Sequence, residues 1–292
     1  MWVQRARMRA FPPVMTWVQN WLPAVLVGFA AAVIAACLAL LGLLVLRPKL
    51  VERHTAGVEP PLRYDATGIE TLQAGTAIAI PHNSGDSVAA ARRALAHGAR
   101  AIEIDVALIG EQLRAAHDIP HRLLGDRFTR RPLLGTVWEI AADAELIVLD
   151  LKGSSTRFVD ALGDFLVERP DAPVVVVGRQ PEALHRLREQ VHVPLLLSVA
   201  DHASLRDLLA LDAAQVDGIS IRHQLLDGEL MNLASERGWV VFAWTVDEPA
   251  RFEHIDRLGV AGVVTDNLAI VEANGAMEVA DPLTALLDRE TA

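Results

Sequence analysis

Glu103 and Asp105 stand one residue apart in the apolar sequence Ala-Ile-Glu-Ile-Asp-Val, residues 101–106. Alternate side chains of a strand point to opposite faces, so both carboxylates would share one face. Neighbouring carboxylates repel each other unless a cation or a basic side chain lies between them, and Mg²⁺ and Ca²⁺ prefer oxygen ligands. The pair therefore indicates a divalent metal site. The alternative for such a pair is a solvent-facing strand edge.

Apolar runs and helical patterns alternate on both sides of these residues. The strands and helices that these patterns predict would position the two carboxylates. Strands are expected at residues 76–82, 101–106, 146–152, 173–177, 194–199, 218–222, 239–246 and 261–265. Helices are expected at residues 87–97, 156–169, 181–190, around Leu205 to Leu209, at 227–238, 249–258 and 268–273. Apolar strands that alternate with helices predict a parallel sheet covered by helices, and this number of strands fits a closed (β/α)₈ TIM barrel.

An open doubly wound sheet is the alternative fold. The barrel is favoured because polar residues end several different strands, and a barrel brings those ends to one rim. They are His82, Asp105, Asp150 with Lys152, Arg179, Trp244 and Asp266. Residues 107–114, with a turn at Gly110-Glu111, predict a hairpin that returns the chain, and with it His117-Asp118, to the side of Asp105.

The order of these motifs resembles the glycerophosphodiester phosphodiesterase family, a family of metal-dependent (β/α)₈ barrels. That family has a His at the end of the first strand, then Glu-x-Asp, His-Asp, an acidic residue-x-Lys, Trp-Thr-Val and Thr-Asp. This chain has His82, Glu103 with Asp105, His117-Asp118, Asp150 with Lys152, Trp244-Thr245-Val246 and Thr265-Asp266, in that order. The resemblance covers about residues 77–272.

The resemblance implies that Glu103, Asp105 and Asp150 bind one divalent cation, Mg²⁺ or Ca²⁺, and that His82 and His117 are the catalytic acid and base. A divalent ion and Lys152 would neutralise the phosphoryl oxygens, and imidazoles titrate near neutral pH, as proton transfer requires. Either histidine could be the acid. The expected substrate-binding residues are Asn83, Asp118, Lys152, Arg179 and Trp244, whose ring offers a face to a choline-like cation.

Two departures from the family pattern affect the expected substrate. The family has Arg directly after the first His, where this chain has Asn83, and it has Glu-Ile-Lys where this chain has Asp150-Leu151-Lys152. Both departures are similar to the sphingomyelinase D and phospholipase D branch. The expected reaction is hydrolysis of glycerophosphodiesters to an alcohol and glycerol 3-phosphate. The alternatives are phospholipase D-type cleavage of lysophospholipids or sphingolipids, and a non-catalytic barrel that binds a partner at the membrane.

The segment from Trp21 to Leu46 contains no charged residue. About 25 helical residues at about 1.5 Å each reach roughly 37 Å, enough to cross a hydrocarbon core of about 30 Å, whereas a cleavable signal peptide has a shorter apolar core. We therefore expect a single-pass membrane protein. The flanks carry equal positive charge, Arg5, Arg7 and Arg9 before the span and Arg47, Lys49 and Arg53 after it. An extracytoplasmic barrel is expected only because that is the usual arrangement of N-terminal anchors.

The expected organisation is a flank at residues 1–20, a transmembrane helix at 21–46, a linker at 47–74, the barrel at 75–275 and a tail at 276–292. The net charge of −10 argues against nucleic acid as a partner, because phosphate backbones attract clustered Lys and Arg. Cys37 is the sole cysteine, which excludes intrachain disulfides and a cysteine metal site.

Overall fold

The computed structural model describes residues 62–67, 69, 72, 75, 77–117, 131–210 and 215–277. The chain divides into two compact units, Met1–Glu59 and Pro60–Ala292, and every described residue belongs to the second. The expected transmembrane segment, residues 21–46, lies outside the described residues. Among the helices that the structure describes, none has the length and hydrophobicity that a membrane span requires.

The described chain alternates strands and helices, as the apolar runs predict. The strands are β1 (Ile78–Pro81), β2 (Ala101–Ile109), β3 (Gln112–Ala115), β4 (Leu146–Leu151), β5 (Val174–Gly178), β6 (Leu195–Val199), β7 (Gly218–Arg222), β8 (Val240–Trp244) and β9 (Gly262–Thr265). The helices are α2 (Val88–Ala96), α3 (Leu134–Ala141), α4 (Thr156–Val167), α5 (Pro181–Arg188), α6 (His202–Ala210), α7 (Gly228–Glu236), α8 (Pro249–Asp256) and α9 (Leu268–Gly275), with a 3₁₀ turn, η4, at His223–Leu225.

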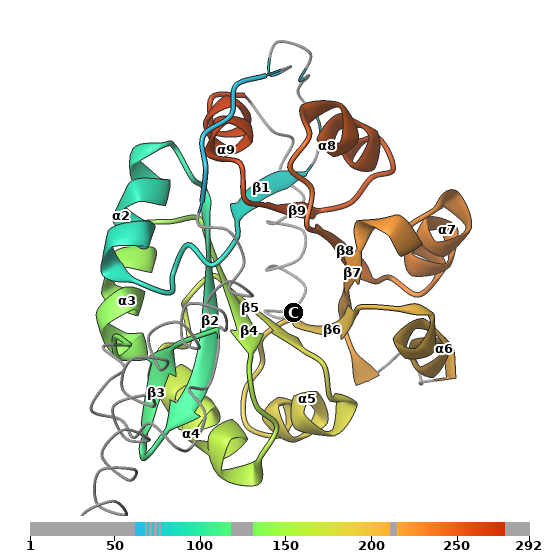
Figure 1. Ribbon diagram of the computed structural model, residues 1–292. Coiled ribbons are helices and arrows are strands. Elements are labelled where there is room, and N and C mark those ends of the chain that lie inside the picture. Colours follow the sequence, from blue (N-terminus) through green and yellow to red (C-terminus); the bar gives the residue numbers. More distant parts are fainter. Residues whose placement is uncertain are drawn as a thin grey trace, which may run out of the picture. The chain divides into compact units, whose positions relative to one another are not determined.

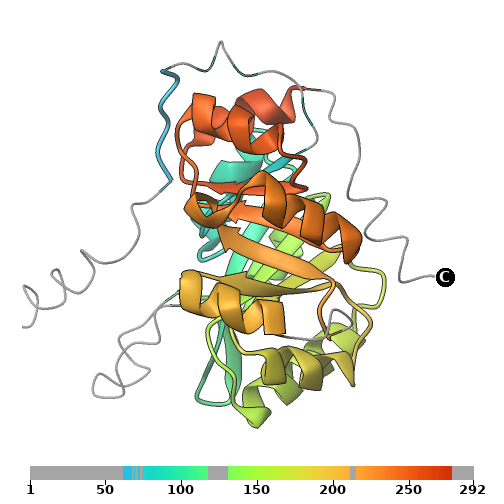
Figure 2. The same cartoon turned by 90° about the vertical axis from the view of Figure 1, so that its right-hand side faces the viewer.

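The strands form one curled sheet in the order β1-β9-β8-β7-β6-β5-β4-β2-β3. All pairings are parallel except that of β2 with β3. The helices lie outside the strands in both views (Figures 1 and 2). The predicted (β/α)₈ class is therefore confirmed as a TIM-barrel-like fold, with one difference from a closed barrel: β1 and β2, at the two ends of the parallel order, share no ladder.

The hairpin predicted after Asp105 is confirmed, because β2 and β3 pair antiparallel with Ile109 opposite Gln112. Helix α3 was not predicted. It buries Leu134, Val137, Trp138 and Ala141, spaced as on one face of a helix. Its Gly135 and Thr136 have low helix propensity, so burial rather than local preference stabilises this helix.

Side-chain caps fix where several outer helices begin. Ser87, Ser155 and Asp227 each accept a hydrogen bond from the backbone N–H three residues ahead, at the start of α2, α4 and α7. Each cap satisfies a backbone donor that would otherwise lack a partner at the helix N-terminus. The caps set the length of each connection that leaves the carboxyl end of a strand.

The barrel interior is a separate apolar cluster, built from alternate residues of the strands. Its buried members are Ile78, Ile80, Ala101, Leu146, Val148, Val175, Val177, Leu196, Phe242 and Val264. Because side chains alternate along a strand, every second residue beyond these members continues on the interior face. The polar residues that end the strands are therefore directed to the mouth of the barrel.

The edge of β1 that faces β2 is satisfied by side chains instead of a ladder. Asp256 Oδ1 accepts from the Ala77 N–H at 2.7 Å, and Asn274 Oδ1 accepts from the Ala79 N–H at 2.8 Å while its Nδ2 donates to the Ala77 carbonyl at 3.0 Å. The next donor on this edge is absent, because residue 81 is proline. Helices α8 and α9 thus supply the partners that β2 would supply in a closed barrel.

Replacing Asn274 by alanine leaves the buried Ala79 N–H and Ala77 carbonyl without these partners. We expect the free energy of unfolding to fall by about 1–3 kcal/mol. Asn232→Ala, on an exposed face of α7, is the matched control and should change stability by less than about 0.5 kcal/mol. Denaturant unfolding measures both, and equal effects of the two substitutions would contradict this account of the β1 edge.

Candidate metal centre

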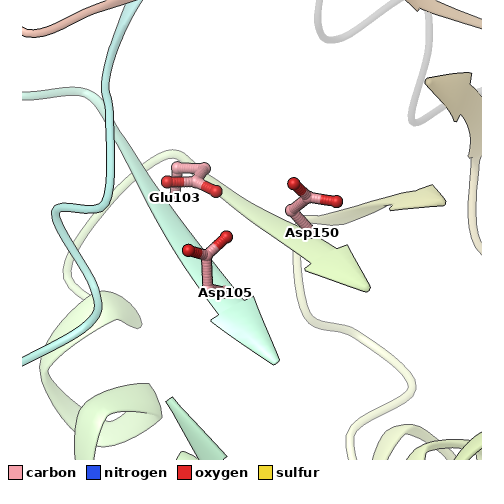
Figure 3. Close-up of side chains that lie close together, drawn as sticks. All are labelled: Glu103, Asp105 and Asp150. Carbon is pink, nitrogen blue, oxygen red and sulfur yellow. The ribbon is translucent and has the colours of Figure 1, made fainter. Parts of the chain in front are cut away.

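Glu103, Asp105 and Asp150 converge at the mouth of the barrel. Ala101 lies in the interior cluster, so Glu103 and Asp105 of β2 follow it on the same face, and Asp150 of β4 pairs with Asp105 across the ladder. One carboxylate oxygen from each of the three residues lies within 4.8 Å of the others. Figure 3 shows the three carboxylates on one side of the neighbouring strands. Glu103 and Asp105 are buried, which excludes the solvent-facing edge that the sequence left open.

Lys152 compensates part of this negative charge. Its Nζ lies 2.8 Å from Asp105 Oδ1 and 2.6 Å from Asp150 Oδ2. The other oxygens, Asp105 Oδ2 and Asp150 Oδ1, are buried and accept no hydrogen bond from the described residues. A buried carboxylate oxygen without a donor is costly, and a hard cation offsets that cost.

The electrostatics of the cluster fit a divalent cation. Burial, and then repulsion by Asp105, raise the pKa of Glu103 well above its ordinary value. Burial also raises the pKa of Asp150, although Lys152 opposes this. Burial alone would lower the pKa of Lys152, but attraction to Asp150 and Asp105 raises it overall. Fully ionised, the three carboxylates would carry more negative charge than the Lys152 ammonium offsets. A divalent cation would balance the remainder, with the oxygens that have no donor among its ligands.

The loop after β1 binds the backbone of β2 directly. Asn83, with a φ of 51°, donates its N–H to Glu103 Oε2. Ser84 Oγ accepts from the Glu103 N–H at 3.1 Å, and the Gly85 N–H donates to the Glu103 carbonyl at 2.6 Å. This loop, residues 83–86, therefore takes the place of a ladder beside β2 and also orients a predicted metal ligand.

Asp86, the last residue of that loop, was not predicted. Its Oδ1 accepts from the Asp105 N–H at 3.0 Å. Burial and the nearby Asp105 raise the pKa of Asp86 to about 8. In the sequence Asp86 stands just before the cap of α2, where an acidic residue is ordinary, so its role depends on the tertiary contact with β2.

His82 is held at the mouth of the barrel by Asp266. Its Nδ1 lies 3.0 Å from Asp266 Oδ1, and both side chains are largely buried. Asp247 in turn accepts from the Asp266 N–H at 2.8 Å. The sequence placed Asp266 on the rim, but nothing in the spacing indicated Asp247 as its support.

His117 follows the hairpin and lies near Asp105 of β2. The preceding residue, Ala116, donates its N–H to the Asp105 carbonyl at 2.7 Å, so the hairpin returns the chain to the site as predicted. Asp118, the neighbouring substrate-binding candidate, lies outside the described residues.

Two more predicted residues lie on other strands of the mouth. Arg179 follows β5 and is exposed, and its charge counters the rise in the pKa of Asp150. Trp244 ends β8 and packs against the interior cluster. Arg222 was not predicted as a site residue, and its Cζ lies 5.5 Å from the centroid of the Trp244 ring.

Residues 138–270 match the Glycerophosphoryl diester phosphodiesterase family. This match confirms the resemblance recognised from the motifs and the predicted enzyme class, a phosphoric diester hydrolase. It includes Asp150, Lys152, Arg179 and Trp244, and it begins after His82, Glu103, Asp105 and His117. No curated protein matches the chain.

Solved structures of similar fold include a glycerophosphodiester phosphodiesterase from Thermotoga maritima, with 18% identity over 68% of this chain and 97% of that chain and a TM-score of 0.54. A glycerophosphodiester phosphodiesterase from Parabacteroides distasonis has 20% identity over 66% and 94%, with a TM-score of 0.51. A phosphodiesterase from Oleispira antarctica, in complex with the product sn-glycerol-3-phosphate, has 17% identity over 70% and 97%, with a TM-score of 0.52. At these sequence identities, the similarity to the solved structures supports the fold alone.

A methyl group at Gly85 would break the contact between the β1 loop and β2. An added Cβ there would lie 2.3 Å from Ile104 Cγ1 and 2.9 Å from the Glu103 carbonyl oxygen. We expect Gly85→Ala to lower the free energy of unfolding by about 1–3 kcal/mol and to weaken divalent-ion binding, because the backbone that carries Glu103 must shift.

Gly228→Ala is the matched control, since an added Cβ at that helix position meets no atom within 4 Å. Urea unfolding and calorimetric titration with Mg²⁺ and Ca²⁺ measure both effects. A Gly85→Ala protein as stable as the control and with unchanged ion binding would contradict the role assigned to the loop.

Proposed function

We propose that this chain is a metal-dependent phosphodiesterase that hydrolyses glycerophosphodiesters to an alcohol and glycerol 3-phosphate. The observation that carries the proposal is the convergence of Glu103, Asp105 and Asp150 within 4.8 Å, with Lys152 beside them, at the mouth of a barrel that matches the family over residues 138–270. The product bound in the Oleispira antarctica phosphodiesterase supports glycerol 3-phosphate as the product.

The three carboxylates would hold one divalent cation, Mg²⁺ or Ca²⁺. Bound there, the ion would supply positive charge to the phosphoryl oxygens, where negative charge increases during the reaction. Lys152 is already within contact of two ligands, and its ammonium would also lie close to a phosphate bound at this site. Arg179 follows β5, the strand next to the one that carries Asp150, and would add a further phosphate contact.

His82 and His117 would move the protons. One imidazole would accept a proton from the attacking water, and the other would donate a proton to the alkoxide released when the phosphorus–oxygen bond breaks. The contact of His82 Nδ1 with Asp266 would orient the ring, with Nε2 as the atom that exchanges the proton. The Asp266 carboxylate would also stabilise the protonated form of His82.

Membrane attachment through residues 21–46 is part of the proposal. Its support is the uncharged segment from Trp21 to Leu46, long enough to cross a bilayer. An extracytoplasmic barrel rests on the usual orientation of such anchors, and protease protection in sealed vesicles tests it.

A phospholipase D-type activity on lysophospholipids or sphingolipids is the second candidate. The observation that favours it is the sequence itself: His82 is followed by Asn83 rather than Arg, and the third acidic residue lies in Asp-Leu-Lys. The loop after β1, residues 83–86, is Asn-Ser-Gly-Asp and contains no arginine, so it offers no guanidinium for the phosphate.

Turnover by the full-length chain in detergent tests the proposal. Glycerophosphoglycerol, glycerophosphocholine and lysophosphatidylcholine would be supplied in parallel, with Mg²⁺, with Ca²⁺ and with EDTA. We expect release of glycerol 3-phosphate that EDTA abolishes, and a fall in kcat/KM of about 100-fold or more in His82→Ala.

His185→Ala, in an exposed position on α5, is the control and should retain full activity. Release of choline from lysophosphatidylcholine without cleavage of the glycerophosphodiesters would favour the phospholipase D-type reaction. No turnover of any of the three substrates would overturn glycerophosphodiester hydrolysis and cleavage of lysophosphatidylcholine, and would favour a non-catalytic barrel.

A further inference from the structure

Arg222 places a second exposed guanidinium at the mouth of the barrel. Arg222 is the last residue of β7 and pairs with Trp244 of β8 across the ladder. Like Gly218 and Ser220, it belongs to the alternate residues of β7 on the interior face. Its Cζ lies 5.5 Å from the Trp244 ring centroid. The Trp244 ring packs on the interior cluster, so the guanidinium is stacked at the inner face of the mouth rather than on the outer wall.

The charge of Arg222 is not neutralised locally. No described carboxylate lies within ion-pair distance of it, and the nearby Asp247 is instead in contact with Arg63 and with the backbone of Asp266. Arg251 of α8 donates to His223 Nδ1 at 3.1 Å and to the His223 carbonyl at 2.9 Å. The Arg222 guanidinium therefore stacks on Trp244 without an ion pair to a described carboxylate.

In the strand order, β7 lies across the barrel from β2, which carries Glu103 and Asp105, and Figure 1 shows the two strands on opposite sides. A phosphodiester bound with its phosphate at the carboxylate cluster would extend one of its two ester groups toward β7 and β8. The face of Trp244 that would suit a trimethylammonium group is in contact with a guanidinium, and two cations at such a distance repel each other.

We propose that the Arg222–Trp244 pair selects against phosphodiesters with a cationic alcohol and favours those whose alcohol carries hydroxyl or anionic oxygens. This inference rests on the proposed phosphodiesterase function and names its substrate class. Arg222 donates hydrogen bonds to the oxygens of such an alcohol, and Trp244 provides the apolar surface beneath it. The expectation of a choline-like ligand at Trp244 is thereby reversed.

The test compares kcat/KM for glycerophosphoglycerol and glycerophosphocholine, using the full-length chain with the divalent cation that supports turnover. We expect wild type to favour glycerophosphoglycerol by about tenfold, the size of effect that one partly screened charge produces. Arg222→Gln should reduce the ratio to about twofold, mainly through KM, and Arg222→Lys should retain most of it because the charge remains.

Arg237→Gln is the matched control. Arg237 also stacks on a tryptophan, with its Cζ 4.6 Å from the Trp239 ring centroid, but at the start of β8 rather than at its carboxyl end. This variant should keep the wild-type ratio. A wild-type preference for glycerophosphocholine, or a ratio that Arg222→Gln leaves unchanged, would overturn the inference while the phosphodiesterase stands. No turnover of either substrate would overturn the proposed function and this inference with it.

Discussion

The burial of several carboxylates at one end of a barrel is the constraint on which the rest of the structure depends. Glu103 and Asp105 lie on the interior face of β2, where the apolar residues Ala101, Leu146 and Val148 precede them on the same or the next strand. Carboxylates in such a position destabilise the fold unless positive charge or donors surround them. Lys152 supplies positive charge and the N–H of Asn83 donates a hydrogen bond. Asp105 Oδ2 and Asp150 Oδ1, which have no donor, mark where further positive charge is needed.

The opening between β1 and β2 makes the site possible. A ladder there would use the backbone groups of β2 for pairing alone. Instead Ser84 and Asp86 accept from the Glu103 and Asp105 N–H groups, so the loop after His82 joins the two strands and holds both predicted metal ligands. The contacts that join the β1 loop to β2 are therefore the same contacts that position Glu103 and Asp105.

Much of this could be read from the sequence, and the rest could not for physical reasons. The apolar runs located the strands, and alternation placed Glu103 and Asp105 on one face, because these depend on local pattern. Asp150 was grouped with them through the family resemblance. The roles of Asp86 and Asn274 could not be predicted, since they depend on which strand edges lack a ladder. The stacking of Arg222 on Trp244 depends on the register between β7 and β8, which no local pattern specifies. The membrane segment and Asp118 stay predictions.

Calorimetric titration of the full-length chain with Mg²⁺ and Ca²⁺ measures whether the buried carboxylates form a divalent-ion site. Asp150→Asn keeps the shape of one ligand but removes its charge, whereas Asp164→Asn removes an exposed carboxylate from α4. We expect a single ion per chain in wild type and in Asp164→Asn, with affinity at least about tenfold weaker in Asp150→Asn. Wild-type protein that binds neither ion, or an Asp150→Asn protein that binds as tightly as wild type, would contradict it.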